Sequence, residues 1–105
     1  IINNGYLGMV RQWQDIFYDQ RYAGTPLHNP NFVKIADAYD IPALAVSRKE
    51  DVEAAIRKAR AHRGPFLIEF KVDPFANVFP MVAPGKSNAD MIRRPMPVTM
   101  EASGK

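Results

Sequence analysis

The sequence predicts an α/β fold with a parallel sheet, in the order β-α-α-β-α-β, followed by an irregular C-terminal tail. Two observations support this prediction. A strand-length apolar run at 42–47, an amphipathic stretch and a second strand-length run at 65–72 follow one another directly. Such a βαβ unit has parallel strands and a right-handed crossover. The run 42–47 is apolar at nearly every position, which suits a sheet covered by helices on both faces.

The chain is expected to open with the end of a strand, Ile1-Ile2, and then a helix. From Leu7 to about Asp19, apolar side chains recur at steps of three and four residues, which indicates a helix with a broad apolar stripe. Gly24-Thr25-Pro26 marks the loop that follows. The stripe consists of Met9, Val10, Trp13, Ile16 and Phe17.

A second helix is predicted to begin at Asn29-Pro30, with asparagine as the N-cap and proline at the first helical position. It is expected to end at Asp40. Its buried side should consist of Phe32, Ile35, Ala36 and Tyr39.

The helix of the βαβ unit has a sequence-level start and stop. Ser47 followed by Glu50 matches a capping box, in which the two side chains satisfy free backbone N–H groups. Glu53 and Arg57 are spaced for an i,i+4 ion pair on the outer face. Gly64 supplies the stop. The side chains expected to be buried are Val52, Ala55, Ile56 and Ala59.

After Val72 the sequence becomes irregular, because five prolines fall within 24 residues. The segment 74–92 is rich in apolar side chains, so we expect it to pack on another part of the protein. Residues 93–105 are expected to be disordered.

Composition excludes several classes of function. The 105 residues contain no cysteine, which excludes disulfides, thiolate-bound zinc and cysteine nucleophiles. The net charge is only +3, and no aromatic residues interleave with the cations to stack bases, so nucleic acid is not an expected partner. No apolar run approaches the roughly 20 residues that span a bilayer. Ile1 opens neither a signal peptide nor a natural start, so we expect the chain to begin inside a longer protein.

One segment has the composition of a ligand site. Asn3 and Asn4 directly follow the expected strand end, and strand ends of open α/β sheets are where ligands bind. An asparagine amide oxygen is a neutral hard ligand suited to Mg²⁺. Asn3-Asn4-Gly5 is equally the composition of a plain strand-ending turn. On the residues alone the turn is favoured, and both alternatives stay open.

The segment from Asn3 to Gln14 resembles the second half of the thiamine-diphosphate motif, which begins with Gly-Asp-Gly and ends in Asn-Asn. Four blocks in order resemble the catalytic (large) subunit of acetolactate synthase, also called acetohydroxyacid synthase, over about residues 1–92. These blocks are Leu7-Gly8-Met9-Val10-Arg11-Gln12-Trp13-Gln14 with the residues to Tyr22, Asn29-Pro30-Asn31-Phe32, Gly64-Pro65-Phe66-Leu67-Ile68, and Val78-Phe79-Pro80-Met81-Val82-Ala83-Pro84-Gly85.

The resemblance implies a fold and a reaction. Residues 1–73 would be the C-terminal part of a doubly wound, parallel-sheet, thiamine-diphosphate-binding domain, and residues 74–92 a segment that covers the active site. The implied reaction is the Mg²⁺- and thiamine-diphosphate-dependent condensation of pyruvate with a second 2-keto acid, in branched-chain amino-acid biosynthesis. This chain would be an incomplete fragment, inactive by itself, and FAD would bind elsewhere in the full-length protein.

The resemblance also implies roles for individual residues. Asn4 and the backbone carbonyl of Tyr6 would bind the Mg²⁺ that anchors the cofactor's diphosphate. Gly8 and Met9 would lie against the cofactor, and Trp13 would line the substrate channel. Pro84-Gly85 would fold over the active site. No catalytic residue is expected in this chain, because the metal-binding aspartate and the activating glutamate lie elsewhere in the family.

The expected partners are pyruvate and 2-ketobutyrate, the rest of the catalytic subunit, a second copy in a homodimer or tetramer, and a small regulatory subunit. Neither nucleic acid nor a membrane is expected. The expected location is the cytoplasm of a bacterium, or a plastid or mitochondrion in a eukaryote. Two alternatives stay open: another thiamine-diphosphate enzyme (a pyruvate oxidase, decarboxylase or glyoxylate carboligase), and a non-catalytic α/β interaction module.

Overall fold

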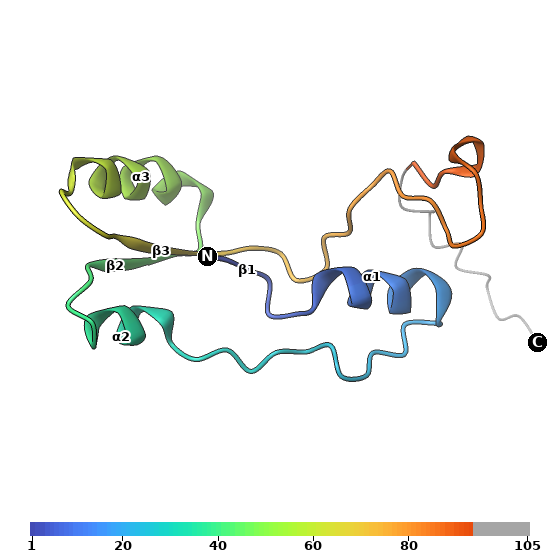
Figure 1. Cartoon of the computed structure of the whole chain (residues 1–105), viewed down its shortest axis with the longest axis horizontal. Coiled ribbons are helices and arrows are strands. Elements are labelled where there is room, and N and C mark those ends of the chain that lie inside the picture. Colours follow the sequence, from blue (N-terminus) through green and yellow to red (C-terminus); the bar gives the residue numbers. More distant parts are fainter. Residues whose placement is uncertain (94–105) are drawn as a thin grey trace, which may run out of the picture.

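A three-stranded sheet occupies one end of the chain, as seen in a computed structural model that describes residues 1–93 (Figure 1). Its strands are β1 (Ile2–Asn3), β2 (Ala43–Val46) and β3 (Leu67–Lys71). The spatial order is β1-β3-β2, and both pairings are parallel. The predicted α/β class with a parallel sheet is therefore confirmed.

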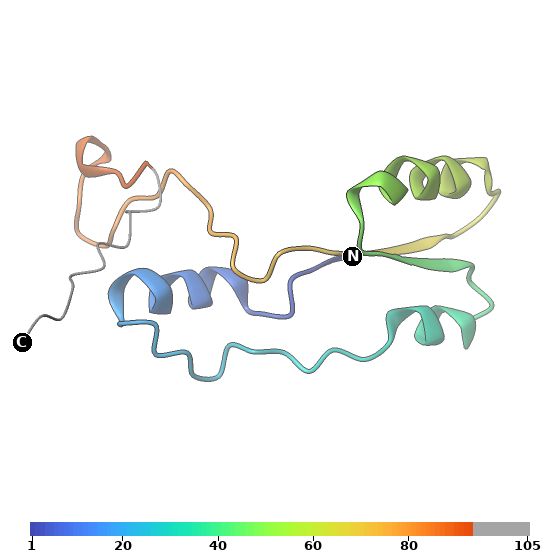
Figure 2. The same ribbon diagram turned by 180° about the vertical axis from the view of Figure 1, so that it is seen from behind.

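Two helices cover the opposite faces of this sheet. In both views α3 (Val52–Ala61) lies on one side of the strands and α2 (Phe32–Asp37) on the other (Figures 1 and 2). The strand–helix–strand unit β2-α3-β3 is thus present as predicted, and its two strands lie side by side. The helices place the sheet between two layers, as the largely apolar run of β2 indicated.

The core of the sheet is small. Phe70 in β3 lies opposite both Ile2 in β1 and Val46 in β2, which fixes the register of the three strands. Val46 is buried, and so are Ala36 of α2 and Ala55 of α3. These are the only apolar side chains among residues 1–93 that are buried.

The start of α2 was predicted two residues too early. The N-cap is Asn31, whose Oδ1 accepts a hydrogen bond from the Lys34 N–H at 3.0 Å. Asn29 instead donates from Nδ2 to the side chain of Asn3, 26 residues away in the chain. Of the predicted buried side, Tyr39 is 75% exposed and Ile35 42% exposed. Only Ala36 is fully covered.

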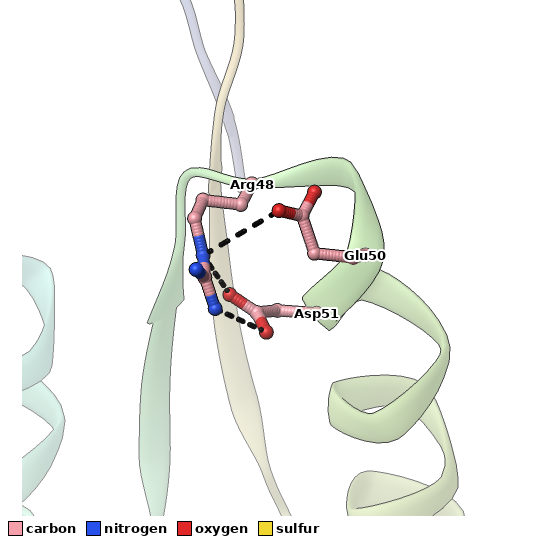
Figure 3. Close-up of polar contacts among 3 residues, drawn as sticks. All are labelled: Arg48, Glu50 and Asp51. Atoms are coloured by element: carbon pink, nitrogen blue, oxygen red, sulfur yellow. Dashed lines mark hydrogen bonds and ion pairs between the residues drawn. The ribbon is translucent and has the colours of Figure 1, made fainter.

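The predicted capping box at the start of α3 is also wrong. A short 3₁₀ turn, Lys49–Asp51, precedes the helix, and its cap residue, Arg48, has no side-chain capping bond. The guanidinium of Arg48 instead holds both oxygens of Asp51, at 2.8 and 3.1 Å, with Glu50 at 3.9 Å (Figure 3). An ion pair thus organises the turn that Ser47 was expected to cap.

Two other local predictions for this part of the chain can be compared with the structure. The ion pair between Glu53 and Arg57 on the outer face of α3 is present. Ile56, expected to be buried, is 42% exposed. A capping box does occur, in the C-terminal segment, where Ser87 and Asp90 satisfy each other's backbone around a 3₁₀ turn, Asn88–Asp90.

The helix α1 (Gly8–Phe17) lies beyond the end of the sheet (Figure 1). The radius of gyration is 18.8 Å and the extents are 60 × 31 × 27 Å. A compact chain of this length would have a radius of gyration of about 13 Å. The described part of the chain is therefore elongated, with the sheet at one end and α1 at the other.

The helix predicted near residues 7–19 is confirmed, but its orientation is not. Its two buried residues are polar, Arg11 and Gln12, each 1% exposed. Met9 and Trp13 of the expected buried stripe are 53% and 42% exposed. Within the described residues, α1 therefore buries its polar side.

Two expectations about the chain as a whole remain. No helix among residues 1–93 is long and apolar enough to cross a membrane. The expected disorder of 93–105 concerns residues that, from 94 onward, lie outside the described part of the chain.

Candidate functional site

The Asn-Asn turn (residues 3–6) follows β1 directly. Oδ1 of Asn3 accepts the N–H of Gly5 at 2.9 Å, and Oδ1 of Asn4 accepts the N–H of Tyr6 at 3.1 Å. Each asparagine thus closes a small side-chain turn on the backbone two residues on, while Gly5 adopts a φ of +70° that other residues rarely tolerate. The turn is present, and the amide oxygen of Asn4 uses only one of its two lone pairs in it, whereas that of Asn3 also accepts a hydrogen bond from Asn29.

The backbone of Tyr6 faces the same side as the Asn4 amide. Tyr6 pairs with Pro26 in an isolated antiparallel bridge. The flanking hydrogen bonds join Leu27 N–H to Gly5 C=O at 2.8 Å and Leu7 N–H to Thr25 C=O at 2.9 Å. In such a pair the N–H and C=O of the central residue point away from the partner strand. Because no backbone N–H among residues 1–93 donates to the Tyr6 carbonyl, that oxygen is available to a ligand.

Gly8 is a glycine because the Asn4 side chain occupies the space of its missing Cβ. A Cβ at this position would lie 2.9 Å from Nδ2 of Asn4. Any other residue at this position would force the amide nitrogen of Asn4 to shift. Gly8 therefore acts on the candidate site through Asn4.

The donor atoms fit part of a magnesium site. Oδ1 of Asn4 and the carbonyl of Tyr6 are neutral oxygen ligands, which Mg²⁺ accepts, and it usually adds carboxylates and substrate phosphates to complete its octahedron. No group of three His, Cys, Asp or Glu residues within 1–93 is placed to hold a metal. The chain thus offers two ligands, and a metal here needs anionic ligands from a phosphate or from another segment.

A buried acidic side chain of the neighbouring strand β3 holds the Asn-Asn turn in place. Glu69, in the middle of β3, is 5% exposed, and its Oε1 accepts a hydrogen bond from Nδ2 of Asn3 at 2.6 Å. Nδ2 of Asn29 donates to Oδ1 of Asn3 at 2.7 Å. Both groups fix the orientation of the Asn3 amide and so the start of the turn. Sequence reasoning missed Glu69, although a single acid flanked by the apolar residues Ile68 and Phe70 was a usable signal.

Two glutamines of α1, the buried Gln12 and the half-buried Gln14, bind polar groups of two different loops. Gln12 accepts the N–H of Val78 at 2.6 Å and donates to the C=O of Val78 at 2.9 Å, as a paired strand would. Gln14 donates to the C=O of Ala23 and accepts the hydroxyl of Thr25, both at 2.9 Å. The C-terminal segment and the loop before α2 are therefore attached to α1 by side-chain amides.

The guanidinium of Arg11 lies among three aromatic rings. Its Cζ is 5.7 Å from the ring centre of Tyr6, 6.0 Å from that of Tyr22 and 5.5 Å from that of Phe75. Nη2 donates to Oδ1 of Asn77 at 2.5 Å, while Nε is buried without a partner among the described residues. Sequence reasoning missed this role, because Arg11 was part of a family motif and its burial depends on residues more than 60 positions away.

Asp15 completes this polar cluster. Its carboxylate accepts hydrogen bonds from Nδ2 of Asn77 at 2.6 Å and from the hydroxyl of Tyr22 at 2.7 Å. Burial favours the neutral acid, but the hydrogen bonds from Tyr22, Asn77 and Gln20 and the charge of Arg11 outweigh it and lower the pKa of Asp15. The same bond to Asp15 raises the pKa of Tyr22.

The opposite side of α1 is apolar and open. Trp13 and Val10 line an open hollow of about 600 Å³ together with Gln14, Tyr18 and Arg21. The structure therefore groups Asn4, Tyr6 and Gly8 at the turn, and places Met9 and Trp13 on the exposed side of the helix that follows it. Pro84 and Gly85 are exposed, and no hydrogen bond within residues 1–93 links them to the turn.

Comparison with known proteins places these features in a family. The family of thiamine pyrophosphate enzymes, C-terminal TPP binding domain, matches residues 1–70. Acetolactate synthase of Arthrospira platensis is 43% identical over 94 residues, and acetolactate synthase large subunit of Porphyra purpurea 46% identical over 94. Each alignment covers 88% of this chain and 16% of the relative.

A third relative, acetolactate synthase isozyme 2 large subunit of Escherichia coli, is 41% identical over 95 residues, which are 90% of this chain and 17% of the relative. The chain thus spans about a sixth of the length of these curated relatives.

Proposed function

This chain belongs to the thiamine pyrophosphate enzymes, by their C-terminal cofactor-binding domain, and on that basis we propose that it serves an acetolactate synthase. The proposed reaction condenses pyruvate, which loses carbon dioxide, with a second pyruvate or with 2-ketobutyrate, as a step of branched-chain amino-acid biosynthesis. The large-subunit relatives at 41–46% identity support this choice within the family.

The observation that best supports cofactor binding is a pair of oxygens at the Asn-Asn turn that can still accept a metal: Oδ1 of Asn4, which has one lone pair left beside its bond to Tyr6, and the carbonyl of Tyr6. Asn4 Oδ1 and the Tyr6 carbonyl face one side, and Gly8 leaves room for the Asn4 amide. We propose that these two oxygens hold Mg²⁺, which would bind the diphosphate of the cofactor. Bound thiamine diphosphate supplies the electron sink that decarboxylation needs.

The residues of α1 have a different role in this proposal. Met9, three residues after the turn, would pack against the cofactor. Trp13, one helical turn further on, would line the channel by which the second keto acid arrives. Apolar side chains at these positions exclude water from the reacting groups. Their 53% and 42% exposure within this chain leaves them free to do so.

Several groups of the proposed enzyme must come from outside the described residues. No cluster of acidic residues there completes a metal site. We therefore propose that the aspartate ligand of Mg²⁺, the glutamate that activates the thiazolium, and the FAD site belong to other segments, and that residues 1–105 alone are inactive. The proposed location is the cytoplasm of a bacterium or an organelle of a eukaryote.

The proposed partners follow from the open surface of α1. Val10 and Phe17, beside Met9 and Trp13, are 53% and 38% exposed, and burial against another chain would remove this apolar area from water. We propose that the rest of the catalytic subunit and a second copy, in a homodimer or tetramer, cover it. A small regulatory subunit is a further proposed partner.

Product analysis tests the proposed reaction. The whole protein, supplied with thiamine diphosphate, MgCl₂, FAD and pyruvate, should form acetolactate, and added 2-ketobutyrate should yield acetohydroxybutyrate. Omitting MgCl₂ from chelator-treated protein should abolish both products. Formation of acetate, acetaldehyde or tartronate semialdehyde from the matching keto acid, in place of these products, would assign the protein to another branch of the family.

A further inference from the structure

The buried guanidinium of Arg11 contacts two parts of the chain that are far apart in sequence. Tyr6, on one side, belongs to the Asn-Asn turn and offers its carbonyl to the proposed metal. Phe75 and Asn77, on the other side, belong to the C-terminal segment (residues 74–92). The rings of Tyr6 and Phe75 are 6.3 Å apart, so the cation lies close to both at once.

The burial of this charge depends on both parts being in place. Arg11 is 1% exposed, and its closest polar partner is the neutral amide of Asn77. The same amide donates from Nδ2 to the carboxylate of Asp15, so Asn77 bridges Arg11 and Asp15. A buried cation without a direct ion pair is costly unless dipoles and ring faces replace its hydration. Removing Phe75 and Asn77 would leave only the tyrosine rings and return the guanidinium to water.

Neighbouring residues of α1 hold successive parts of the C-terminal segment. Gln12, the next residue of α1, hydrogen-bonds to both the N–H and the C=O of Val78. These two bonds fix the position of the C-terminal segment along the helix. Arg11 then joins the start of that segment to the ring of Tyr6. Figure 1 shows this segment running from the end of β3 along α1.

We infer that Arg11 is a positioning residue that couples the Asn-Asn turn to the C-terminal segment, so that binding at the turn and docking of residues 75–78 stabilise each other. This inference rests on the proposed function, because it takes the turn to be the cofactor's metal site. Coupling is reciprocal: if the docked segment favours cofactor binding, the bound cofactor slows release of the segment by the same factor.

Hydrogen–deuterium exchange of the whole protein, with and without thiamine diphosphate and MgCl₂, tests this coupling. In the wild type, the cofactor should slow exchange in a peptide that covers 75–79. In Arg11→Met, which keeps length but removes the charge, exchange there should be fast and the same with and without the cofactor. The half-saturating cofactor concentration should rise about 5-fold or more.

Three further variants make the test specific. Arg57→Met makes the same chemical change on the exposed face of α3 and should behave as the wild type. Arg11→Lys keeps a cation near the rings and should restore part of the cofactor's effect. Phe75→Leu removes one ring while leaving the turn intact, and should lose the cofactor's effect even if Arg11→Met does not fold.

The outcomes separate the inference from the proposed function. If the wild type binds no thiamine diphosphate in the presence of MgCl₂, the proposed function fails, and the inference fails with it. If the wild type binds it, but Arg11→Met or Phe75→Leu retains the full cofactor-dependent protection of 75–79, the inference alone is overturned. Faster exchange that the cofactor still slows by the wild-type factor would indicate a merely structural role and would also overturn it.

Discussion

The two ends of the molecule are organised in opposite ways. The sheet end consists of β2 and β3 with α2 and α3. Its buried side chains include Ala36, Val46 and Ala55, and its strands are joined by backbone hydrogen bonds. At the α1 end the fully buried side chains are Arg11, Gln12 and Thr25, and polar side chains attach the loops. The apolar residues Met9, Val10, Trp13 and Phe17 of α1 lie on the surface.

This difference indicates that the sheet end serves as a scaffold and that the α1 end offers a surface to which other groups can bind. The sheet end buries small apolar residues between its layers, although Ile2, Ile35 and Ile56 stay exposed. A helix held from behind by polar contacts presents its apolar side outward, where a cofactor, a substrate channel or another segment can bury it. The residues proposed for function, from Asn4 to Trp13, all belong to or adjoin this second end.

The largest effect is expected for Gln12→Leu. This change removes two hydrogen bonds between the Gln12 side chain and the backbone of Val78, and each such bond contributes about 0.5–1.5 kcal/mol. We expect the exchange of residues 78–82 to accelerate by about 10-fold or more, while β2 and β3 are unchanged. Gln14→Leu is the matched control, since it should release residues 23–25 instead. Equal protection of 78–82 in the wild type and in Gln12→Leu would show that polar contacts do not hold this end.

Val46→Ala tests the sheet end. Two methyl groups are removed from a side chain that is 6% exposed, so we expect a loss of about 2 kcal/mol, measured from the exchange of the β2 and β3 amides. The exchange of residues 75–79 should stay the same if the two ends are organised separately. A joint loss of protection at both ends would contradict the distinction drawn between them.

A pH titration of the wild type and of Asp15→Asn tests the charge of Asp15 at the α1 end. The folded-state pKa of Asp15 is lowered, so its charge stabilises the fold above the unfolded pKa of about 3.9, and this contribution is lost as the pH falls through the lower, folded value. The difference in melting temperature between the wild type and Asp15→Asn should therefore be full at neutral pH, begin to shrink as the pH falls below about 4, and disappear only below the folded-state pKa of Asp15. A difference that is constant across this range would mean that the charge of Asp15 does not contribute.

The smallest effect is expected for Glu53→Gln on the outer face of α3. Both partners of this ion pair are more than two-thirds exposed, and such i,i+4 pairs contribute about 0.3–0.5 kcal/mol. Chemical denaturation at low and high salt should show a loss of this size that vanishes in high salt. A loss above about 1 kcal/mol would mean that α3 depends on its surface charges more than on Ala55.

The sheet end could be predicted from the sequence because its signals are local. Alternation and apolar runs defined β2 and β3, and the spacing of Val52, Ala55 and Ala59 defined α3. One set of errors there concerns burial, because Ile35, Tyr39 and Ile56 are exposed. The other concerns caps: Asn29 hydrogen-bonds to Asn3, and the Arg48–Asp51 ion pair organises the turn after Ser47. Neither choice is visible in the neighbouring residues.

The α1 end could be predicted only in part. The helix itself follows from its periodicity, and the turn from Asn3-Asn4-Gly5. Which side of the helix is buried depends on Asn77 and Val78, which are about 66 residues further along the chain. Glu69 likewise acquires its partner from another strand. Long-range polar partners are the part that a single sequence does not reveal.

Equilibrium binding of thiamine diphosphate tests the central claim most directly, that the Asn-Asn turn holds a metal–diphosphate group. The whole protein should bind the cofactor in the presence of MgCl₂, and Asn4→Ala should weaken binding by a factor of about 10–100 or more, since one ligand oxygen is lost. Asn31→Ala, which removes the cap of α2, is the matched control and should bind as the wild type does. Unchanged affinity in Asn4→Ala would contradict the account.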